Sequence, residues 1–239
     1  MIPKIIHYCW FGRGEMPELA AKCIASWHEF MPDWEYKLWK EDNFDVNQLP
    51  YTKEAYEARK FAFVSDYVRL WALCNEGGLY LDTDVEAFKP FDDLLGLTAF
   101  AGFEGSKHIP MGTCVMASEA NGLWVKEQLE NYQDRHFILP DGTLDLTTNV
   151  QFISAKMREQ GFVQNGKEQD YKDLHVFPVE YFCPRQTTGE YFRTENTYCD
   201  HLGLGSWAES NEGWKARIGR LVGPKIMTRL IKMKRRWVG

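Results

Sequence analysis

The stretch of residues 61–85, FAFVSDYVRLWALCNEGGLYLDTDV, constrains the fold of this chain more than any other. Its first part places apolar side chains at helical spacing. The pair Gly77-Gly78 stops that helix, and the apolar run at residues 79–81 predicts a short strand. Two carboxylates, Asp82 and Asp84, stand at the end of that strand. A helix, a turn and a buried strand in direct succession are typical of an α/β sheet with helices on its faces.

Periodicity along the rest of the chain extends this α/β pattern. Strands are expected at residues 2–10, 34–39, 79–81, 98–103, 113–117 and, as an edge-type strand, 175–182. Helices are expected at residues 17–30, 53–74 (one or two helices), 123–132 and 149–160. Ligands of open α/β sheets lie beyond the carboxyl ends of the strands. We therefore expect Trp10, Asp82 and Asp84, each at such an end, to meet in one cleft.

The size and the cysteine content of the chain indicate its class. A chain of 239 residues can bury a full core, and one domain of two coupled halves is expected. The six cysteines form no C-x-x-C pair and no metal-finger spacing, so we expect reduced thiols that pack as small hydrophobes. The chain shows neither a leader peptide nor the roughly 18–20 apolar residues that span a bilayer. These features predict a cytoplasmic protein, either soluble or peripheral at the inner face of the membrane.

Charge is distributed unevenly along the chain. The formal net charge is −6, yet no acidic residue follows Glu212 and nine lysines and arginines do. After Pro224, apolar residues such as Leu230 and Trp237 fall on one helical side and basic residues on the other. This tail, residues 213–239, fits an anionic membrane surface, or it packs on the body as a last helix with solvated charges. Because the tail is short and the body is acidic, no nucleic-acid partner is expected.

The two carboxylates at the strand end are candidate metal ligands. At a spacing of two, Asp82 and Asp84 lean to the same face, and hard oxygen ligands suit Mg²⁺ or Mn²⁺ bridging a diphosphate. The alternative is an ordinary turn cluster, because aspartate is common where loops begin. Asp66 and Arg69, one helix upstream, are candidates for the same site. At a spacing of three they also suit a plain helical ion pair.

Three segments, taken in order, resemble glycosyltransferase family 32. These are the DXD sugar-binding enzymes of capsular polysaccharide synthesis, related to the large clostridial glucosylating toxins. The segments read IPKIIHYCW at residues 2–10, SDxxR at residues 65–69 and GGxYxDxD at residues 77–84. A closing segment follows, with NTYxxH at residues 196–201 and GSW at residues 205–207. Within it, Asp200 stands where an apolar residue is expected, and it either has no effect or adds a carboxylate near the metal.

The resemblance implies a GT-A type α/β fold with a mixed central sheet flanked by helices. It implies a single catalytic domain over residues 1–212, with a nucleotide-sugar half at about 1–105 and an acceptor half with the closing segment at 106–212. It further implies a nucleotide-diphospho-sugar donor, a divalent cation (usually Mn²⁺, or Mg²⁺) and retention of the anomeric configuration. The middle of the chain, residues 106–174, matches nothing in the family and would shape the acceptor site.

Site residues also follow from the resemblance, position by position. Donor contacts are implied for Ile6, His7 and Trp10 at the base, for Asp66 and Arg69 at the sugar and ribose–phosphate, for Gly78 beside the sugar, and for Ser206 and Trp207 at the β-phosphate. Metal contacts are implied for Asp82, which also meets the ribose, and for Asp84 directly, and His201 is implied to contact either the metal or the diphosphate. Two alternatives remain, because His7 also fits a hydrogen-bonded core histidine and Trp207 fits a core aromatic residue.

The function expected from these residues is hexose transfer to a saccharide or a lipid-linked acceptor. A UDP-sugar is favoured as the donor, with galactose or glucose ahead of GDP-mannose. No carboxylate nucleophile is evident, so a same-face mechanism is expected in which the leaving phosphate helps to deprotonate the acceptor. One alternative is a phosphatase of the haloacid dehalogenase type, whose DXD normally opens the fold, whereas two predicted strands precede it here. Another is a non-catalytic sugar-binding module.

Overall fold

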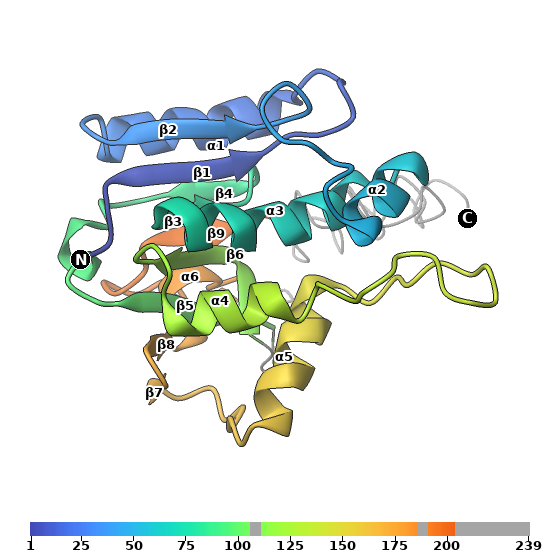
Figure 1. The fold of residues 1–239 in the computed structure, drawn as a ribbon. Coiled ribbons are helices and arrows are strands. Elements are labelled where there is room, and N and C mark those ends of the chain that lie inside the picture. The colour runs from blue at the N-terminus through green and yellow to red at the C-terminus, as the bar shows by residue number, and fades with distance from the viewer. Residues whose placement is uncertain (106–110, 186–190, 204–239) are drawn as a thin grey trace, which may run out of the picture.

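The computed structural model describes residues 1–105, 111–185 and 191–203 (Figure 1). Its strands are β1 (Ile5–Cys9), β2 (Glu35–Trp39), β3 (Gly78–Leu81), β4 (Val85–Ala87), β5 (Ala99–Phe103), β6 (Met111–Ser118), β7 (Gln169–Tyr171), β8 (Leu174–Phe177) and β9 (Cys199–His201). Its helices are α1 (Glu18–Phe30), α2 (Pro50–Glu57), α3 (Phe61–Glu76), α4 (Leu123–Glu130), α5 (Asn149–Glu159) and α6 (Val179–Phe182). A 3-10 turn covers Asp92–Leu94. No helix within these described ranges is both long and apolar enough to cross a bilayer.

Seven of the strands form one mixed sheet in the order β2-β1-β3-β6-β5-β8-β7. β1 lies parallel to both β2 and β3, while β6 runs antiparallel between β3 and β5. Since β3 and β5 are both antiparallel to β6, they run in the same direction. The carboxyl ends of β2, β1, β3 and β5 therefore meet at one edge of the sheet. The predicted mixed α/β sheet with flanking helices is confirmed.

Two hydrophobic cores cover the two faces of this sheet. One contains buried side chains of α2, α3, α4 and α5, and the other contains those of α1, α6 and the two-stranded β4–β9 ribbon. In β3, Tyr80 belongs to the first core and Leu79 and Leu81 to the second, as expected for a strand buried on both faces. Figure 1 shows α3 and α4 on the near face and the β4–β9 ribbon on the far face.

The glycine pair between α3 and β3 is required by the backbone. Gly77 caps α3 with φ +68°, and its N–H donates to the carbonyl of Leu73. Gly78 has φ +117°, and a Cβ placed there would lie 2.6 Å from the Ile5 carbonyl oxygen and 3.1 Å from His7 Nε2. Both positions have conformations that glycine adopts most readily. The close approach at Gly78 thus allows β3 to pack directly on β1.

His7 is a core histidine with both ring nitrogens bonded. Its side chain is fully buried, and Trp39 Nε1–H donates to His7 Nδ1 at 3.1 Å. Because Nδ1 accepts, the proton belongs on Nε2, which lies 2.8 Å from the Gly77 carbonyl oxygen and donates to it. Burial lowers the pKa of His7, although the Gly77 carbonyl opposes this shift. The neutral ring therefore connects β1, β2 and the turn before β3.

One predicted segment differs from the structure, and the structure decides a second that the sequence left open. The single strand expected at 175–182 divides into β8 and α6, because Pro178 ends the ladder and begins the helix as its N-cap. β8 is also not an edge strand, since it pairs with both β5 and β7. The helical stretch 53–74 is two helices, separated at Arg59, which has φ 58°. Three-residue strands such as β4, β7 and β9 are too short to leave a periodic signal.

Gly78→Ala is expected to lower the free energy of unfolding by about 3 kcal/mol, because backbone strain and a backbone clash add. The matched control is Gly142→Ala, where φ is +83° but no atom lies within 4 Å of the added Cβ. That change should cost only about 1 kcal/mol. Urea denaturation measures both values, and equal losses would contradict the packing role of Gly78.

His7→Gln is expected to change how stability depends on pH. Because the folded pKa of His7 lies below the unfolded value of 6.5, the unfolded state binds more protons as the pH falls below that value. The contribution of His7 to the free energy of unfolding is therefore complete above pH 6.5. As the pH falls below this value, the contribution decreases by up to about 1.4 kcal/mol per pH unit. The free energy of unfolding is measured by urea denaturation between pH 7 and 5. The difference between the wild type and the variant should show this slope. A difference that stays constant with pH would contradict it.

Candidate functional site

The turn after β3 presents two carboxylates at the sheet edge. The backbone N–H of Asp82 donates to the Cys114 carbonyl at 2.9 Å, which ties the end of β3 to β6. The N–H of Val85 then donates to the Asp82 carbonyl at 3.0 Å and closes the turn. Asp82 and Asp84 therefore stand on a backbone that is bonded on both sides.

The β4–β9 ribbon brings His201 to this turn from far along the chain. Val85 pairs with His201, and the Leu202 N–H donates to the Asp84 carbonyl at 3.0 Å. His201 Nε2 lies 3.3 Å from Asp84 Oδ1. The ligand atoms of Asp82, Asp84 and His201 all lie within 4.8 Å of one another. The three side chains are 25%, 13% and 27% exposed, so the group is open to solvent on one side.

This group has the donor set of a divalent cation site. Two carboxylates and one imidazole suit Mn²⁺, and the carboxylates alone suit Mg²⁺. Burial lowers the pKa of His201, but Cys114 and the Asp84 carboxylate raise it more, so the net shift is upward. A proton and a cation would therefore compete for the ring.

Arg69 is buried at the base of the site and contacts several elements. One guanidinium nitrogen lies 2.9 Å from Asp66 Oδ1 and 3.3 Å from Asp82 Oδ1. The other terminal nitrogen donates to the Thr113 carbonyl at 2.7 Å. The guanidinium also lies 4.7 Å from the centre of the Tyr80 ring, whose hydroxyl donates to Asp82 Oδ1 at 2.9 Å. The Arg69 side chain is only 6% exposed, so it contacts Asp82 from the buried side of the site and helps to fix the orientation of that carboxylate.

Asp66 joins the same network to the start of α5. Its Oδ2 accepts the backbone N–H of Asn149 at 3.1 Å, and the Asn149 amide donates to the Asp66 carbonyl at 3.2 Å. Burial raises the pKa of Asp66 to about 6, although Arg69 lowers it. The i,i+3 ion pair between Asp66 and Arg69 exists, and it is part of the network that holds Asp82.

The predicted donor-binding residues lie in different surroundings. Ile6 and His7 are fully buried, and Gly78 packs against β1, so in the structure all three support the strands. Trp10 is half-buried and lines an open pocket of about 260 Å³. Ser206 and Trp207 lie outside the described residues, as does the tail 213–239.

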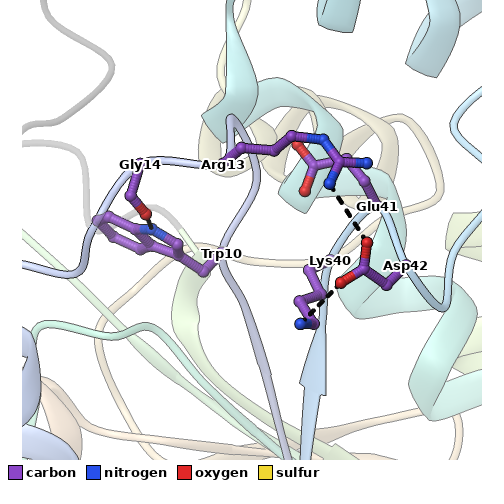
Figure 2. Close-up of a pocket in the computed structure, with 6 residues that line it drawn as sticks. All are labelled: Trp10, Arg13, Gly14, Lys40, Glu41 and Asp42. Carbon is purple, nitrogen blue, oxygen red and sulfur yellow. Dashed lines mark hydrogen bonds and ion pairs between the residues drawn. The ribbon is translucent and has the colours of Figure 1, made fainter.

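This pocket lies where β1 and β2 end, beside the end of β3 (Figure 2). Trp10 Nε1–H donates to the Gly14 carbonyl at 2.6 Å, which fixes the indole at the pocket wall. Arg13 and Lys40 both reach Asp42, at 3.3 and 2.8 Å. An aromatic wall with a charged rim therefore lies along the same sheet edge as the two carboxylates. The full lining is Trp10, Arg13, Gly14, Lys40, Glu41 and Asp42.

Two further carboxylates, Glu104 and Asp200, lie near the site in different surroundings. Glu104 directly follows β5, which runs parallel to β3, so it reaches the same sheet edge. The sequence analysis missed it, although the signal that selected Asp82, an acid at the end of an apolar strand, was present. Asp200 is 1% exposed and lies 2.8 Å from an Arg185 nitrogen, outside the group of Asp82, Asp84 and His201. It does not add a carboxylate to the metal ligands.

Comparison with known proteins gives a consistent match. The family described as "Glycosyltransferase sugar-binding region containing DXD motif" matches residues 17–101. Inositol phosphoceramide mannosyltransferase 3 of Schizosaccharomyces pombe is 34% identical over 103 residues, which cover 41% of this chain and 29% of that protein. Mannosyl phosphorylinositol ceramide synthase CSH1 of Saccharomyces cerevisiae is 27% identical over 190 residues, which cover 72% of this chain and 49% of that protein. The chain spans less than half the length of these relatives.

A solved structure with a similar fold is that of the PaToxG glycosyltransferase. It superposes with a TM-score of 0.53 at 18% identity, covering 67% of this chain and 70% of that chain. At this level of identity the likeness concerns the fold alone. The GT-A type fold that the sequence predicts is confirmed.

Arg69→Met is expected to lower the free energy of unfolding by about 3–5 kcal/mol, because it leaves the buried Asp66 carboxylate and the partly buried Asp82 carboxylate without their cation. The loss should be smaller at pH 5 than at pH 8. Asp66, with a pKa of about 6 that Arg69 lowers, takes up a proton in the variant as the pH falls, which removes one uncompensated charge.

The matched control is Arg13→Met, at an arginine that is 67% exposed and 3.3 Å from Asp42. This exposed ion pair should contribute less than about 1 kcal/mol. Urea denaturation at the two pH values measures the free energy of unfolding of both variants. Equal losses for Arg69→Met and Arg13→Met would contradict the proposed role of Arg69.

Proposed function

We propose, from the premise that residues 17–101 belong to the DXD-containing glycosyltransferase sugar-binding family, that this protein transfers a hexose from a nucleotide-diphospho-sugar. The observation that carries the proposal is the convergence of Asp82, Asp84 and His201 on one sheet edge, next to the pocket at Trp10. A diphosphate bound at this edge would lie between a nucleoside in the pocket and a sugar near the carboxylates. The acceptor would be a hydroxyl group of a saccharide or a lipid-linked molecule.

Asp82, Asp84 and His201 are the residues that would hold the cation, either Mn²⁺ or Mg²⁺. When bound, it supplies positive charge that stabilises the negative charge developing on the departing diphosphate. Arg69 is a positioning residue in this scheme, because it contacts Asp82 and is itself buried. The Tyr80 hydroxyl has the same role through its bond to Asp82 Oδ1. Both reduce the freedom of a carboxylate that must bind in one orientation.

The pocket at Trp10 suits the nucleoside half of the donor. An indole offers an aromatic face on which a base can stack, and the rim of Lys40 and Asp42 offers one donor and one acceptor group for polar edges. UDP-glucose and UDP-galactose are the donors that we propose first. GDP-mannose is the competing choice, because the two relatives are named as mannosyltransferase and mannosyl phosphorylinositol ceramide synthase.

The arrangement of carboxylates supports transfer with retention on one face of the sugar. Asp66 and Asp82 contact Arg69, and Asp84 contacts His201, so none of these three is an unpaired nucleophile. Glu104 at the same edge lies beside His201, and it is the carboxylate on which a covalent adduct would be sought. In this proposal the departing phosphate accepts the proton of the acceptor hydroxyl as the new glycosidic bond forms. A covalent glycosyl–enzyme adduct trapped with a slow donor would contradict it.

A lipid-linked acceptor is supported by two observations. The names of two relatives mention inositol phosphoceramide and mannosyl phosphorylinositol ceramide, which are lipids. The sequence of residues 213–239 is basic, with apolar and basic residues on opposite helical sides. We propose that this tail contacts an anionic membrane surface and keeps the enzyme peripheral to it.

Asp84→Asn is expected to abolish Mn²⁺-dependent release of nucleotide from the donor. A loss of at least about 100-fold is predicted, because a metal ion contributes several kcal/mol to such steps. The assay is a donor screen with UDP-glucose, UDP-galactose and GDP-mannose, scored as nucleotide released with Mn²⁺ and after chelation.

The matched control is Glu86→Gln, an exposed carboxylate two residues further along, which should leave release unchanged. Hydrolysis of simple phosphate esters without action on any nucleotide-sugar would identify a phosphatase and contradict the proposal. Tight metal and nucleotide binding with no turnover on any donor would identify a sugar-binding module and contradict it as well.

A further inference from the structure

A second group of metal-ligating side chains lies behind His201. One ligand atom each from Glu104, Cys114, Cys183 and His201 lies within 4.8 Å of the others. The two sulfur atoms are 3.4 Å apart, and Cys114 and Cys183 are 2% and 5% exposed. Four elements bring these residues together, namely the end of β5, strand β6, the C-cap of α6 and strand β9.

Packing accounts for the two thiols but not for the whole group. A buried cysteine behaves as a small hydrophobe, and Cys114 and Cys183 belong to the second hydrophobic core. Apolar packing does not explain the half-buried carboxylate beside them, because burial of an ionised group is unfavourable unless a nearby charge compensates it. Within the described residues, no hydrogen bond or ion pair joins the Glu104 carboxylate to another side chain. A cation held by the group would compensate the charge of this carboxylate.

We propose that Glu104, Cys114, Cys183 and His201 form a second, thiolate-containing metal site that takes Zn²⁺. Two sulfurs, one imidazole and one carboxylate are the ligand types of four-coordinate zinc, whereas Mn²⁺ and Mg²⁺ prefer oxygen. As zinc binds, each cysteine S–H bond breaks, the proton passes to solvent and a zinc–sulfur bond forms. The oxidation state of the metal and of both sulfurs stays the same.

The geometry requires only a small adjustment for zinc. Zinc–sulfur bonds of about 2.3 Å in a tetrahedron place two sulfurs roughly 3.8 Å apart. The observed 3.4 Å must therefore increase by about 0.4 Å. A disulfide would instead require the sulfurs to approach to about 2.05 Å, which is a movement of more than 1 Å between strand β6 and the C-cap of α6. The observed spacing is that of two reduced thiols in a hydrogen bond, and it is compatible with zinc after the smaller of the two movements.

The two metal sites share His201. If the ring turns toward the sulfurs to bind zinc, it no longer serves Asp82 and Asp84, so the oxygen-rich site loses one of its three ligands. Zinc should then weaken the binding of Mn²⁺. This consequence rests on the proposed function of the Asp82–Asp84 site. The zinc site itself does not, since it depends only on the four side chains.

The test uses Co²⁺ as a spectroscopic probe of the reduced, metal-free chain of 239 residues. Tetrahedral cobalt bound to thiolate gives strong visible bands and a sulfur-to-metal charge-transfer band in the near ultraviolet, and one equivalent of Zn²⁺ should bleach both. Cys114→Ser and Cys183→Ser should each reduce the charge-transfer band and lower zinc affinity at least about tenfold. Cys74→Ser, at a buried thiol in α3 outside the group, is the matched control and should change neither.

Several outcomes would overturn the proposal. These are the absence of a thiolate band in the wild type, a band that is unchanged in both serine variants, and oxidation of the pair to a disulfide with no metal-dependent band. Circular dichroism of each variant shows whether it is folded. Asp84→Asn separates the two proposals, because it should keep the cobalt thiolate band while Mn²⁺-dependent nucleotide release is lost.

Discussion

The pairing of β4 with β9 is the constraint on which the site depends. Without it, Asp82 and Asp84 form a turn with no third ligand, since His201 is far away along the chain. The ordering of so long a connection is entropically unfavourable, and burial of Val85, Ala87 and Cys199 in the second core offsets it. The ribbon thus connects the packing of one face of the sheet to the geometry of its edge.

Compensation of the negative charge of the carboxylates is the second requirement, and Arg69 provides it. A carboxylate at a strand end can bind a cation only if it is held in one place, yet ionised groups that are nearly buried are costly. Arg69 contacts Asp66 and Asp82 together, so one buried cation compensates two carboxylates. Asp66 in turn accepts the backbone N–H of Asn149 at the start of α5. The orientation of Asp82 is therefore coupled to the position of a helix on the same face of the sheet.

Local sequence patterns predicted the sheet, the glycine break and the two acidic side chains, because each leaves a signal within a few residues. They also selected Asp66 and Arg69. His201 was selected only by the resemblance to glycosyltransferase family 32, and the structure places its ring beside Asp82 and Asp84. His7 and Gly78 show the limit of that reasoning. The motif marks both positions, but only the three-dimensional packing shows that they support β1 and β3 from inside.

Contacts between distant segments account for the features that the sequence analysis missed. Glu104, like Asp82, is an acidic residue at the end of an apolar strand, so the sequence could have indicated it. Its position beside two thiols depends on four separate elements, which no local pattern shows. Cys114 and Cys183 were expected only to be buried. The segment 175–182 was assigned to one strand because its apolar alternation outweighed Pro178, which in the structure ends β8.

The most direct test of the central claim is the position of Mn²⁺ in crystals grown with a nucleoside diphosphate. Anomalous diffraction at the manganese edge locates the ion without reference to activity. The account predicts one strong peak within bonding distance of Asp84, with Asp82 and His201 in its coordination sphere. A peak elsewhere, or a bound nucleotide with no metal near these three residues, would contradict it.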